Sequence, residues 1–345
     1  MTVKKIYVSK IYTDEEIKKK EGDHIDITPA YKIINTSADV YIKETGELLA
    51  KFRKNVISDK LTKLGWDAFH KTSAPSRNRG SASGPINLTS NYWKKRKPVS
   101  IKKWAVKYIH KGKKSKMEIN NNVYSSVLGY FESTPFRGIP CRMTSYTQKY
   151  HKYYMMGIPF IEEISRQFKK LVPSAYQTQK RFIDKHSDYR VGNTAFSSIT
   201  VNRNFRTGLH RDAGDFKKGF GNLTVVEYGK YHGGETLFPQ FEIGFDLRQG
   251  DFIAMNVHEW HCNSKLYETE ADKKFNEKLP VIFKHDTKTG TLGSKWKFSR
   301  ISFVCYIREK IAGCNPKETK KYYKKIGFDP VIGFTKKTKK TKKAN

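Results

Sequence analysis

The chain has 345 residues, of which 37% are hydrophobic, and among them are 21 Phe and 20 Tyr. This apolar content suffices for a large core in one big domain or two small ones. No run approaches the about eighteen apolar residues of a membrane-spanning helix, and the N-terminus lacks the apolar stretch and cleavage site of a secretory signal. We therefore expect a globular, intracellular protein that is not secreted and has no membrane partner.

The charge balance is strongly basic, with 67 Lys and Arg against 33 Asp and Glu and a formal net charge of +34. Such a surface binds polyanions. Nucleic acid is favoured over a lipid surface, because the sequence contains no amphipathic basic helix with a large apolar face. The alternative is a lysine bias of the whole proteome, which would raise the Lys content without any nucleic-acid function.

The cysteine pattern indicates neither a disulfide framework nor a zinc cluster. The four cysteines (Cys141, Cys262, Cys305 and Cys314) form no CxxC pair. We expect all four to be reduced. Nothing in the sequence indicates an obligate protein partner.

The first third of the chain is basic and mixed. Residues 39–53 predict a hairpin around Thr45 and Gly46, residues 58–70 a short capped helix, and the Ser-, Gly- and Pro-rich residues 73–85 a loop. Residues 91–116 interleave aromatic and basic side chains. This pattern suits bases stacked over a neutralised backbone, but it is also typical of a solvated surface with a few core aromatics.

The middle of the chain predicts helices followed by short strands. Apolar residues from Phe160 to Leu171 fall on one face of a helix that starts at Pro159, and a second helix is expected over residues 174–185. Short β-rich runs follow at 194–205, 223–228, 235–238, 242–247, 252–257 and 301–307. Closely spaced short strands without helices between them predict a jelly-roll-like barrel or sandwich.

These patterns predict an α+β protein with a double-stranded β-helix (jelly-roll, cupin-like) core, flanking helices and a basic N-terminal extension. The expected division is an extension over residues 1–118, a core over 119–312, and a C-terminal helix with a disordered Lys-rich tail over 313–345. Residues 265–299 are long, polar and Lys-rich, so we interpret them as an insertion before the last core strand.

A metal site is indicated by the sequence His210-Arg211-Asp212, which follows a predicted strand. Residues two apart in an extended segment point to the same side, so the imidazole and the carboxylate converge. Non-haem Fe(II) oxygenases use two His and one carboxylate and leave open positions for a keto acid and dioxygen. His258 and His261 are the candidates for the third ligand. An HxD pair alone is weak, because it occurs by chance in many proteins.

The order of motifs makes the metal hypothesis more specific. After the HxD pair come a Gly233-Gly234 turn, a Gly250-Asp251 turn, a late His, and finally Arg300 at the start of a strand. Arg300 and Ser302 share one face of that strand, where a guanidinium and a hydroxyl can bind a terminal carboxylate. The alternative for Arg300 is an ion pair at the rim of the fold.

Four stretches resemble the TET/JBP branch of 2-oxoglutarate dioxygenases, which oxidise the methyl group of thymine or 5-methylcytosine in nucleic acid. They are FSSITVNRNFRTGLHRDAGD (196–215), GFGNLTVVEYGKYHGGETLFPQF (219–241), LRQGDFIAMNVHEWHCN (247–263) and RISFVCYIRE (300–309). Weaker likeness reaches upstream to SVLGYF, CRMTSYT and PSAYQTQ, so the resemblance spans roughly residues 120–310. Together these motifs are much more specific than any one of them.

The resemblance implies roles for particular residues. It matches His210, Asp212 and His261 to the ligands of Fe(II), with His261 favoured because the family's late His precedes a small residue and Asn. It matches Arg300 to the residue that binds 2-oxoglutarate, and O2 is the further co-substrate.

Two more positions are implied to contact ligands. Asp215 falls where the family places an acid on the target base, and an ionised carboxylate there would only accept hydrogen bonds. Its alternative is to cap the following turn. Arg206 lies near a second co-substrate contact. The number of residues between His261 and Arg300 is larger than in the family pattern. If Arg300 is not the residue that binds 2-oxoglutarate, Arg308 is the alternative.

The partner that the resemblance implies is DNA, with RNA left open, and the protein would act in the nucleus or wherever its target DNA resides. A base buried in a duplex would have to be flipped out to reach the iron. Three alternatives remain: an oxygenase of a protein or small molecule on the same fold, a catalytically inactive nucleic-acid-binding relative, and a zinc protein.

Overall fold

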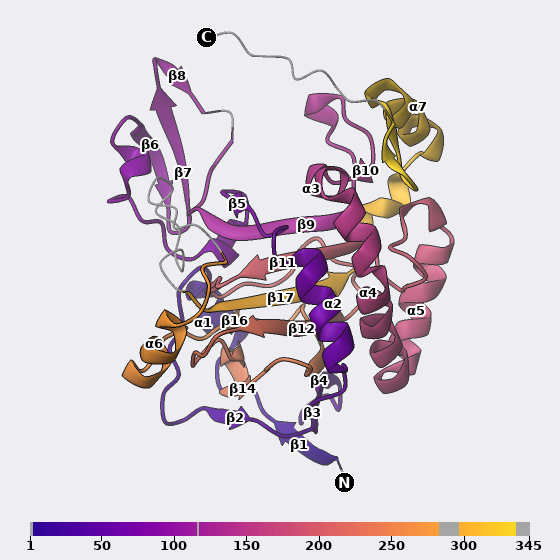
Figure 1. Ribbon diagram of the computed structural model, residues 1–345. Coiled ribbons are helices and arrows are strands. Elements are labelled where there is room, and N and C mark those ends of the chain that lie inside the picture. Colours follow the sequence, from indigo (N-terminus) through magenta and orange to yellow (C-terminus); the bar gives the residue numbers. More distant parts are fainter. Residues whose placement is uncertain (1–2, 116, 283–296, 336–345) are drawn as a thin grey trace.

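The computed structural model describes residues 3–115, 117–282 and 297–335 (Figure 1). Its largest sheet has ten strands. Nine of them run in the order β1 (Lys4–Val8), β3 (Ala38–Ile42), β4 (Leu48–Arg53), β15 (Phe252–Met255), β12 (Gly221–Tyr228), β17 (Ser299–Tyr306), β11 (Ser198–Arg203), β9 (Val123–Phe131) and β10 (Arg142–Met143). The tenth, β5 (Pro75–Ser76), also pairs with β9.

A second sheet packs against one face of the first. It has four strands in the order β16 (Cys262–Asn263), β13 (Thr236–Phe238), β14 (Ile243–Phe245) and β2 (Lys32–Ile34). Alternate residues of the main sheet, such as Val225 and Ile253, are buried with Phe238 and Phe245 of the small sheet. The Phe52 and Phe245 rings lie 5.8 Å apart across the interface. This two-layer β core confirms the predicted jelly-roll class.

Helices cover the other face of the main sheet: α2 (Asp59–Phe69), α4 (His151–Leu171) and α5 (Pro173–Asp184) (Figure 1). Successive side chains of a strand point to opposite faces. In β17, Ile301 and Phe303 point toward these helices, and the residues that alternate with them point toward the space between the two sheets. The helix predicted from Pro159 begins earlier, at His151, so Pro159 lies inside α4. Because proline has no backbone N–H, one hydrogen bond of the helix is lost and the helix is destabilised. Burial of the apolar side of α4 offsets this loss.

The N-terminal segment contributes strands to the main sheet. β3 and β4 form the predicted hairpin, and β4 pairs with β15 of the core, where Phe252 lies opposite Arg53. The helix predicted over residues 58–70 is α2; Ser58 is its N-cap residue, but its side chain makes no capping hydrogen bond with the described residues. No helix in the described ranges is both long and apolar enough to cross a membrane.

Apart from three strands within residues 97–114, the remaining elements are short. They are α1 (Asp14–Lys19), α3 (Ser145–Lys149), α6 (Glu270–Glu277), α7 (Pro316–Ile326), β18 (Phe328–Asp329), β19 (Gly333–Phe334) and six 3-10 turns in the described ranges. α6 falls in the expected insertion, of which residues 283–296 lie outside the described residues. The expected disordered tail, residues 336–345, also lies outside them.

Residues 91–115, which we call the basic arm, project from the core at the upper left of Figure 1. Their strands are β6 (Lys97–Lys102), β7 (Ala105–His110) and β8 (Lys113–Lys114). The rings of Tyr92, Trp93 and Tyr108 pack together with centroids 5.2 to 6.2 Å apart. Arg96 lies 3.8 Å above Tyr92. These aromatics therefore form the interior of the arm, while most of its lysines are exposed.

The expectation that all four cysteines are reduced is wrong for two of them. Cys141 and Cys314 form a disulfide, while Cys262 and Cys305 are free and buried. The two bonded residues are 173 positions apart. The pair meets because α7 folds back onto the segment after β9, a contact that no local spacing indicates.

Candidate active site

Three side chains meet between the two sheets. Potential ligand atoms of His210, Asp212 and His261 all lie within 4.8 Å of one another. His210 Nε2 is 3.7 Å from one carboxylate oxygen of Asp212, and His261 Nε2 is 3.9 Å from the other. Two imidazoles and one carboxylate around a common point are the donor set of a non-haem Fe(II) site, so these residues fit the expected metal.

Backbone contacts orient both imidazoles. His210 Nδ1 lies 2.8 Å from the carbonyl of Gly208, and His261 Nδ1 lies 2.9 Å from that of Glu259. A carbonyl accepts only, so each Nδ1 donates and each Nε2 keeps its lone pair for the shared centre. Burial and the neighbouring His261 lower the pKa of His210 to about 4, which keeps that imidazole neutral.

His258, the other candidate for the third ligand, lies outside this group. Its Nε2 is 3.3 Å from the carbonyl of Phe216, and its backbone N–H donates to the Asn256 side chain. The structure thus brings His261, and not His258, to His210 and Asp212.

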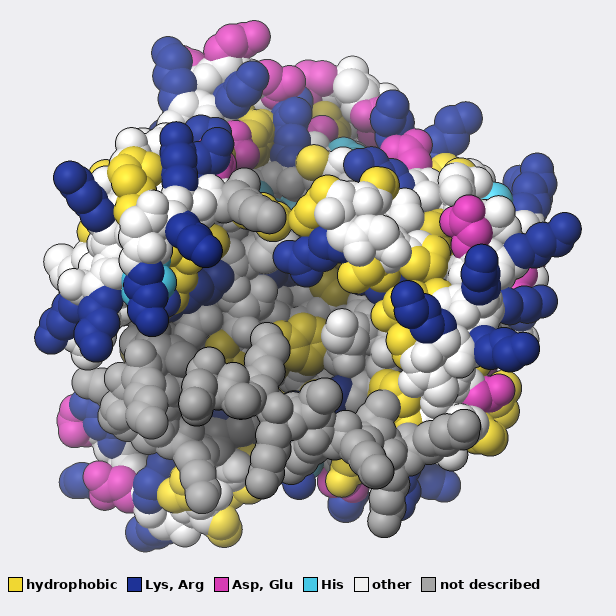
Figure 2. Space-filling model, turned by 90° about the horizontal axis from the view of Figure 1, so that it is seen from above, with side chains coloured by type: hydrophobic (Ala, Val, Ile, Leu, Met, Phe, Trp, Pro, Cys, Tyr) yellow, Lys and Arg dark blue, Asp and Glu magenta, His cyan; other side chains and the backbone are white. Residues whose placement is uncertain are grey.

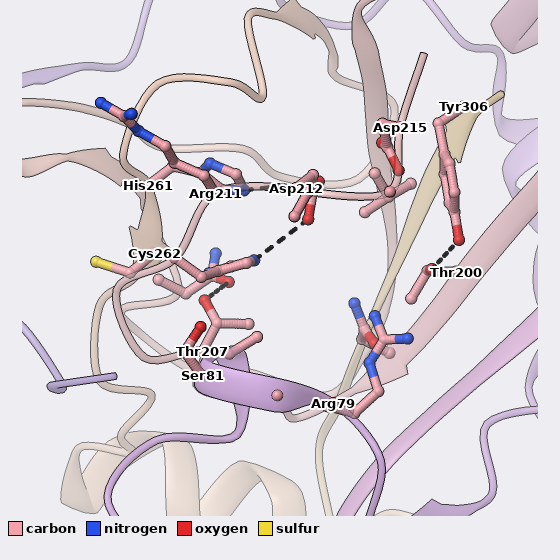
Figure 3. Close-up of a pocket in the computed structure, with 18 of the residues that line it drawn as sticks. Arg79, Ser81, Thr200, Thr207, Arg211, Asp212, Asp215, His261, Cys262 and Tyr306 are labelled. Carbon is pink, nitrogen blue, oxygen red and sulfur yellow. Dashed lines mark hydrogen bonds and ion pairs between the residues drawn. The ribbon is translucent and has the colours of Figure 1, made fainter. Parts of the chain in front are cut away.

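The three residues line a cavity of about 340 Å³ (Figure 3). Its wall includes alternate residues of β11 and β17, among them Thr200, Ser302 and Tyr306. The Tyr306 hydroxyl lies 3.2 Å from the Thr200 hydroxyl. Tyr306 was not predicted as a site residue, although strand alternation from Arg300 places it on the same face of β17.

Arg300 is 5% exposed and carries a guanidinium with unused donors. Its Nε and Nη2 are buried and have no hydrogen-bond partner among the described residues. Buried donors are normally satisfied, and an arginine is costly to bury unpaired. Arg300 is not itself in the cavity wall, but Ser302, on the same face of β17, is. An anionic ligand such as a carboxylate fits these orphaned donors.

The other two arginines considered from sequence have partners. Arg206 forms a 2.6 Å ion pair with Asp26 and donates to the carbonyl of Ile25, and it is absent from the cavity wall. Its Nε is nevertheless buried without a hydrogen-bond partner among the described residues, and the co-substrate contact of Arg206 stays a prediction. Arg308 lines the cavity and donates through Nε to Glu132 at 2.9 Å.

Asp215 lies in the cavity wall and is 8% exposed. Its backbone pairs with Arg308, and its buried Oδ2 accepts no hydrogen bond from the described residues. Burial, followed by the charge of Asp212, raises the pKa of Asp215 well above its usual value, while Arg308 and Arg79 oppose the rise. Burial and the charge of Asp212 both favour the protonated form, in which a carboxyl donates as well as accepts, and the contact of Asp215 with the target base stays a prediction.

Arg79 is a second cavity residue that sequence reasoning missed. It comes from the loop over residues 73–85, and Figure 3 shows its side chain pointing from that loop into the cavity. Its Nε is buried without a hydrogen-bond partner among the described residues. No sequence signal links this loop to the distant HxD motif.

Comparison with known proteins agrees with this geometry. Residues 126–309 match the Tet/JBP family model, described as the oxygenase domain of the 2OGFeDO superfamily. Thymine dioxygenase JBP1 of Trypanosoma brucei brucei is 31% identical over 170 residues, 48% of this chain and 19% of that protein. Thymine dioxygenase JBP1-A of Trypanosoma cruzi is 33% identical over 145 residues, 41% of this chain and 17% of that protein.

A further relative is the bifunctional helicase and thymine dioxygenase JBP2 of Leishmania tarentolae, 30% identical over 148 residues, 42% of this chain and 13% of that protein. The chain thus spans less than a fifth of the length of these relatives. Among solved structures, NgTET1 in complex with 5mC DNA aligns at 12% identity and a TM-score of 0.48 over 87% of this chain and 88% of that one. With more than half of its length matched by the family model, the chain belongs to the Tet/JBP oxygenase family of the 2OGFeDO superfamily.

Proposed function

We propose that this protein is an Fe(II)- and 2-oxoglutarate-dependent dioxygenase that hydroxylates the 5-methyl group of a pyrimidine, thymine or 5-methylcytosine, in DNA. The observation that carries the proposal is the convergence of His210, Asp212 and His261 in one cavity. Family membership supports the cofactor and co-substrate, and the names of the JBP relatives support a thymine-type methyl group as the target.

In this proposal, each side chain of the site has one task. His210, Asp212 and His261 hold Fe(II), and Arg300 with Ser302 binds a carboxylate of 2-oxoglutarate. Bound iron with 2-oxoglutarate and O2 supplies the oxidising chemistry, which yields succinate, carbon dioxide and a hydroxylated C–H bond. The protein's part is to orient the reactants and to exclude water from the buried cavity.

Asp215 is proposed to contact the target base. Its carboxyl lies in the same cavity wall as Asp212, and its Oδ2 is free to accept a hydrogen bond. The exocyclic amine of 5-methylcytosine and the ring N–H of thymine are both donors that fit it. Tyr306 borders the same space, and we propose that its ring packs against the base. A base in a duplex must leave its stack to reach them.

The surface charge supports a nucleic-acid substrate. Seen from above, many lysine and arginine side chains lie along the part of the border of a hollow that described residues form (Figure 2). The basic arm adds exposed lysines, among them Lys94, Lys95, Lys113 and Lys114. Neutralising phosphates with such side chains provides affinity that offsets the cost of flipping a base. We propose that the protein works wherever its target DNA resides.

We propose residues 119–312 as the catalytic domain, with the segment 265–299 as its insertion. The family match at 126–309 lies within these bounds. The extension 1–118 lends β3 and β4 to the main sheet and Arg79 to the cavity, so we propose that it is needed for the site to form.

The deciding experiment is mass spectrometry of nucleosides from DNA treated with the protein, Fe(II), 2-oxoglutarate and O2. We expect an oxidised thymine or 5-methylcytosine and succinate in equal amounts, and neither with Asp212→Ala. Succinate formation that DNA does not stimulate would favour a protein or small-molecule substrate. DNA binding without succinate would favour an inactive relative.

A further inference from the structure

A second cavity of about 430 Å³ adjoins the candidate active site. The two cavities share four wall residues, Asn78, Arg79, Tyr306 and Arg308. The second one lies along the outer edge of β9, between β5, which pairs at Val123, and β10, which pairs at Phe131. The two cavities are therefore direct neighbours, with these four residues at their boundary.

The wall of the second cavity is cationic and rich in hydroxyls. It contains three arginines, Arg79, Arg142 and Arg308, and no aspartate or glutamate among the described residues. The rest of the wall includes serines and a threonine, among them Ser126 and Thr144, and the apolar or aromatic residues Val127, Phe131, Tyr146 and Tyr306. This lining contrasts with the first cavity, whose wall includes the acids Asp212 and Asp215.

The arginines of this wall differ in their partners. Arg142 Nη1 donates to the carbonyls of Glu132 and Pro140, at 3.3 and 3.2 Å, and no described carboxylate forms an ion pair with its guanidinium. Its side-chain partner is the uncharged Tyr322, so no described carboxylate neutralises the charge of Arg142. Arg308 differs, because its Nε donates to the Glu132 carboxylate.

Arg79 stands at the junction of the two cavities. The backbone N–H groups of Arg79 and Gly80 both donate to Asn120 Oδ1 at 2.9 Å. Asn120 is itself 5% exposed and donates to the carbonyl of Trp104. The loop is thus fixed, and the buried Arg79 Nε remains without a hydrogen-bond partner among the described residues. An anion at the junction would satisfy it.

We propose that the second cavity is a phosphate-binding subsite, which takes the backbone phosphate next to the nucleotide whose base enters the first cavity. Guanidinium groups and hydroxyls are the side chains that bind phosphate oxygens. The three arginines of this wall favour an anionic phosphodiester over a neutral second base, although the wall also contains the aromatic residues Phe131, Tyr146 and Tyr306. The inference rests on the proposed function and deepens it by assigning the path of the strand.

The test starts from two oligonucleotides, one with a single thymine and one with a single 5-methylcytosine as the target base. The oligonucleotide that the wild-type protein oxidises is used for all further measurements. In matched copies, one phosphate at a time on either side of the target is replaced by a neutral methylphosphonate. Affinity is measured by fluorescence anisotropy for the wild-type protein, for Arg142→Gln, and for Arg181→Gln, an exposed arginine of α5 outside both cavities.

We expect Arg142→Gln to bind the unmodified strand about ten-fold more weakly, because one charge-assisted contact is lost. One methylphosphonate next to the target should weaken wild-type binding equally, and combining it with Arg142→Gln should add nothing. Arg181→Gln should match the wild type on every strand. The proposed subsite would be wrong if the losses of affinity from Arg142→Gln and from the methylphosphonate were fully additive. It would also be wrong if a methylphosphonate weakened binding equally at every position of the strand.

If Arg142→Gln does not fold, the proposal is tested by the wild-type protein alone, through its affinity for the strands that carry one methylphosphonate at each position. Failure of the proposed function has a different signature, since the wild type would then oxidise neither oligonucleotide.

Discussion

The backbones of His210 and His261 exchange two hydrogen bonds, each N–H donating to the other residue's carbonyl at 3.0 Å. This isolated bridge joins the HxD segment to the segment that precedes β16. The two imidazoles are therefore brought together by the fold itself, with ring centroids 4.4 Å apart. A site held in this way should exist before metal binds, so loss of one ligand should affect metal affinity and leave the fold intact.

Removing single ligands tests this site. Asp212→Ala and His261→Ala should each weaken Fe(II) binding by about a hundred-fold or more, because even changes to residues behind the ligands cost ten- to a hundred-fold. His258→Ala should bind iron like the wild type, since His258 contacts the Phe216 carbonyl instead. Anaerobic titration calorimetry measures the affinity, and circular dichroism checks the fold. Loss of iron binding in His258→Ala would reassign the third ligand.

Arg300→Gln should raise the KM for 2-oxoglutarate by about ten- to a hundred-fold, because a charge-assisted contact contributes roughly 1.5–3 kcal/mol. The buried, unpartnered Nε and Nη2 of Arg300 motivate this expectation. Arg308→Gln is the matched control, since its guanidinium already pairs with Glu132. Succinate formation is measured against 2-oxoglutarate concentration for both variants. A KM shift in Arg308→Gln alone would move the co-substrate contact to Arg308.

Local patterns predicted the parts of the site that depend on strand geometry. His210 and Asp212 are two positions apart, and Arg300 and Ser302 lie on one face of a strand, so alternation alone relates each pair. The same rule extends from Arg300 to Tyr306 and would have found that residue. The strand runs and the order of the motifs likewise predicted the jelly-roll class, which the two packed sheets confirm.

Contacts between segments that are distant in the chain could not be predicted from the sequence. Arg79 reaches the cavity only because Asn120 and the core position its loop, and this depends on packing across the molecule. The disulfide between Cys141 and Cys314 has the same origin. The start of α4 was misplaced for another reason: a proline suits the first turn of a helix, and the tertiary burial that keeps Pro159 inside α4 is invisible locally.

Binding to DNA should weaken steeply with salt, and the basic arm should contribute to the slope. Each phosphate that a lysine neutralises adds about −0.7 to −0.9 to the slope of log affinity against log salt. Changing Lys94, Lys95, Lys113 and Lys114 together to Gln should therefore make the slope shallower. Conversion of 2-oxoglutarate without DNA should not change. Anisotropy titrations over a salt series measure the slope, and an unaltered slope would remove the arm from the DNA interface.

The last prediction concerns the stability of the metal-free protein and the carboxyl of Asp215. Burial, and secondly the charge of Asp212, raises the pKa of this group in the folded state above its value in the unfolded chain. Between these two pKa values the folded protein binds more protons than the unfolded one, so the free energy of unfolding falls as pH rises through that window. Above it, the folded state holds a buried charge whose Oδ2 has no partner among the described residues.

Asp215→Asn cannot ionise and should be more stable than the wild type at pH 7.5, where folding of the wild type must either bind a proton or bury a charge; each unit by which the pKa is raised is worth about 1.4 kcal/mol. Near pH 4 the two proteins should be about equally stable, because the wild-type carboxyl is then protonated in the folded state. Urea unfolding across this pH range measures the difference, with the exposed Asp188→Asn as the matched control. If Asp215→Asn is instead less stable at pH 7.5, the attraction of Arg308 and Arg79 for the ionised carboxylate exceeds the cost of burying it.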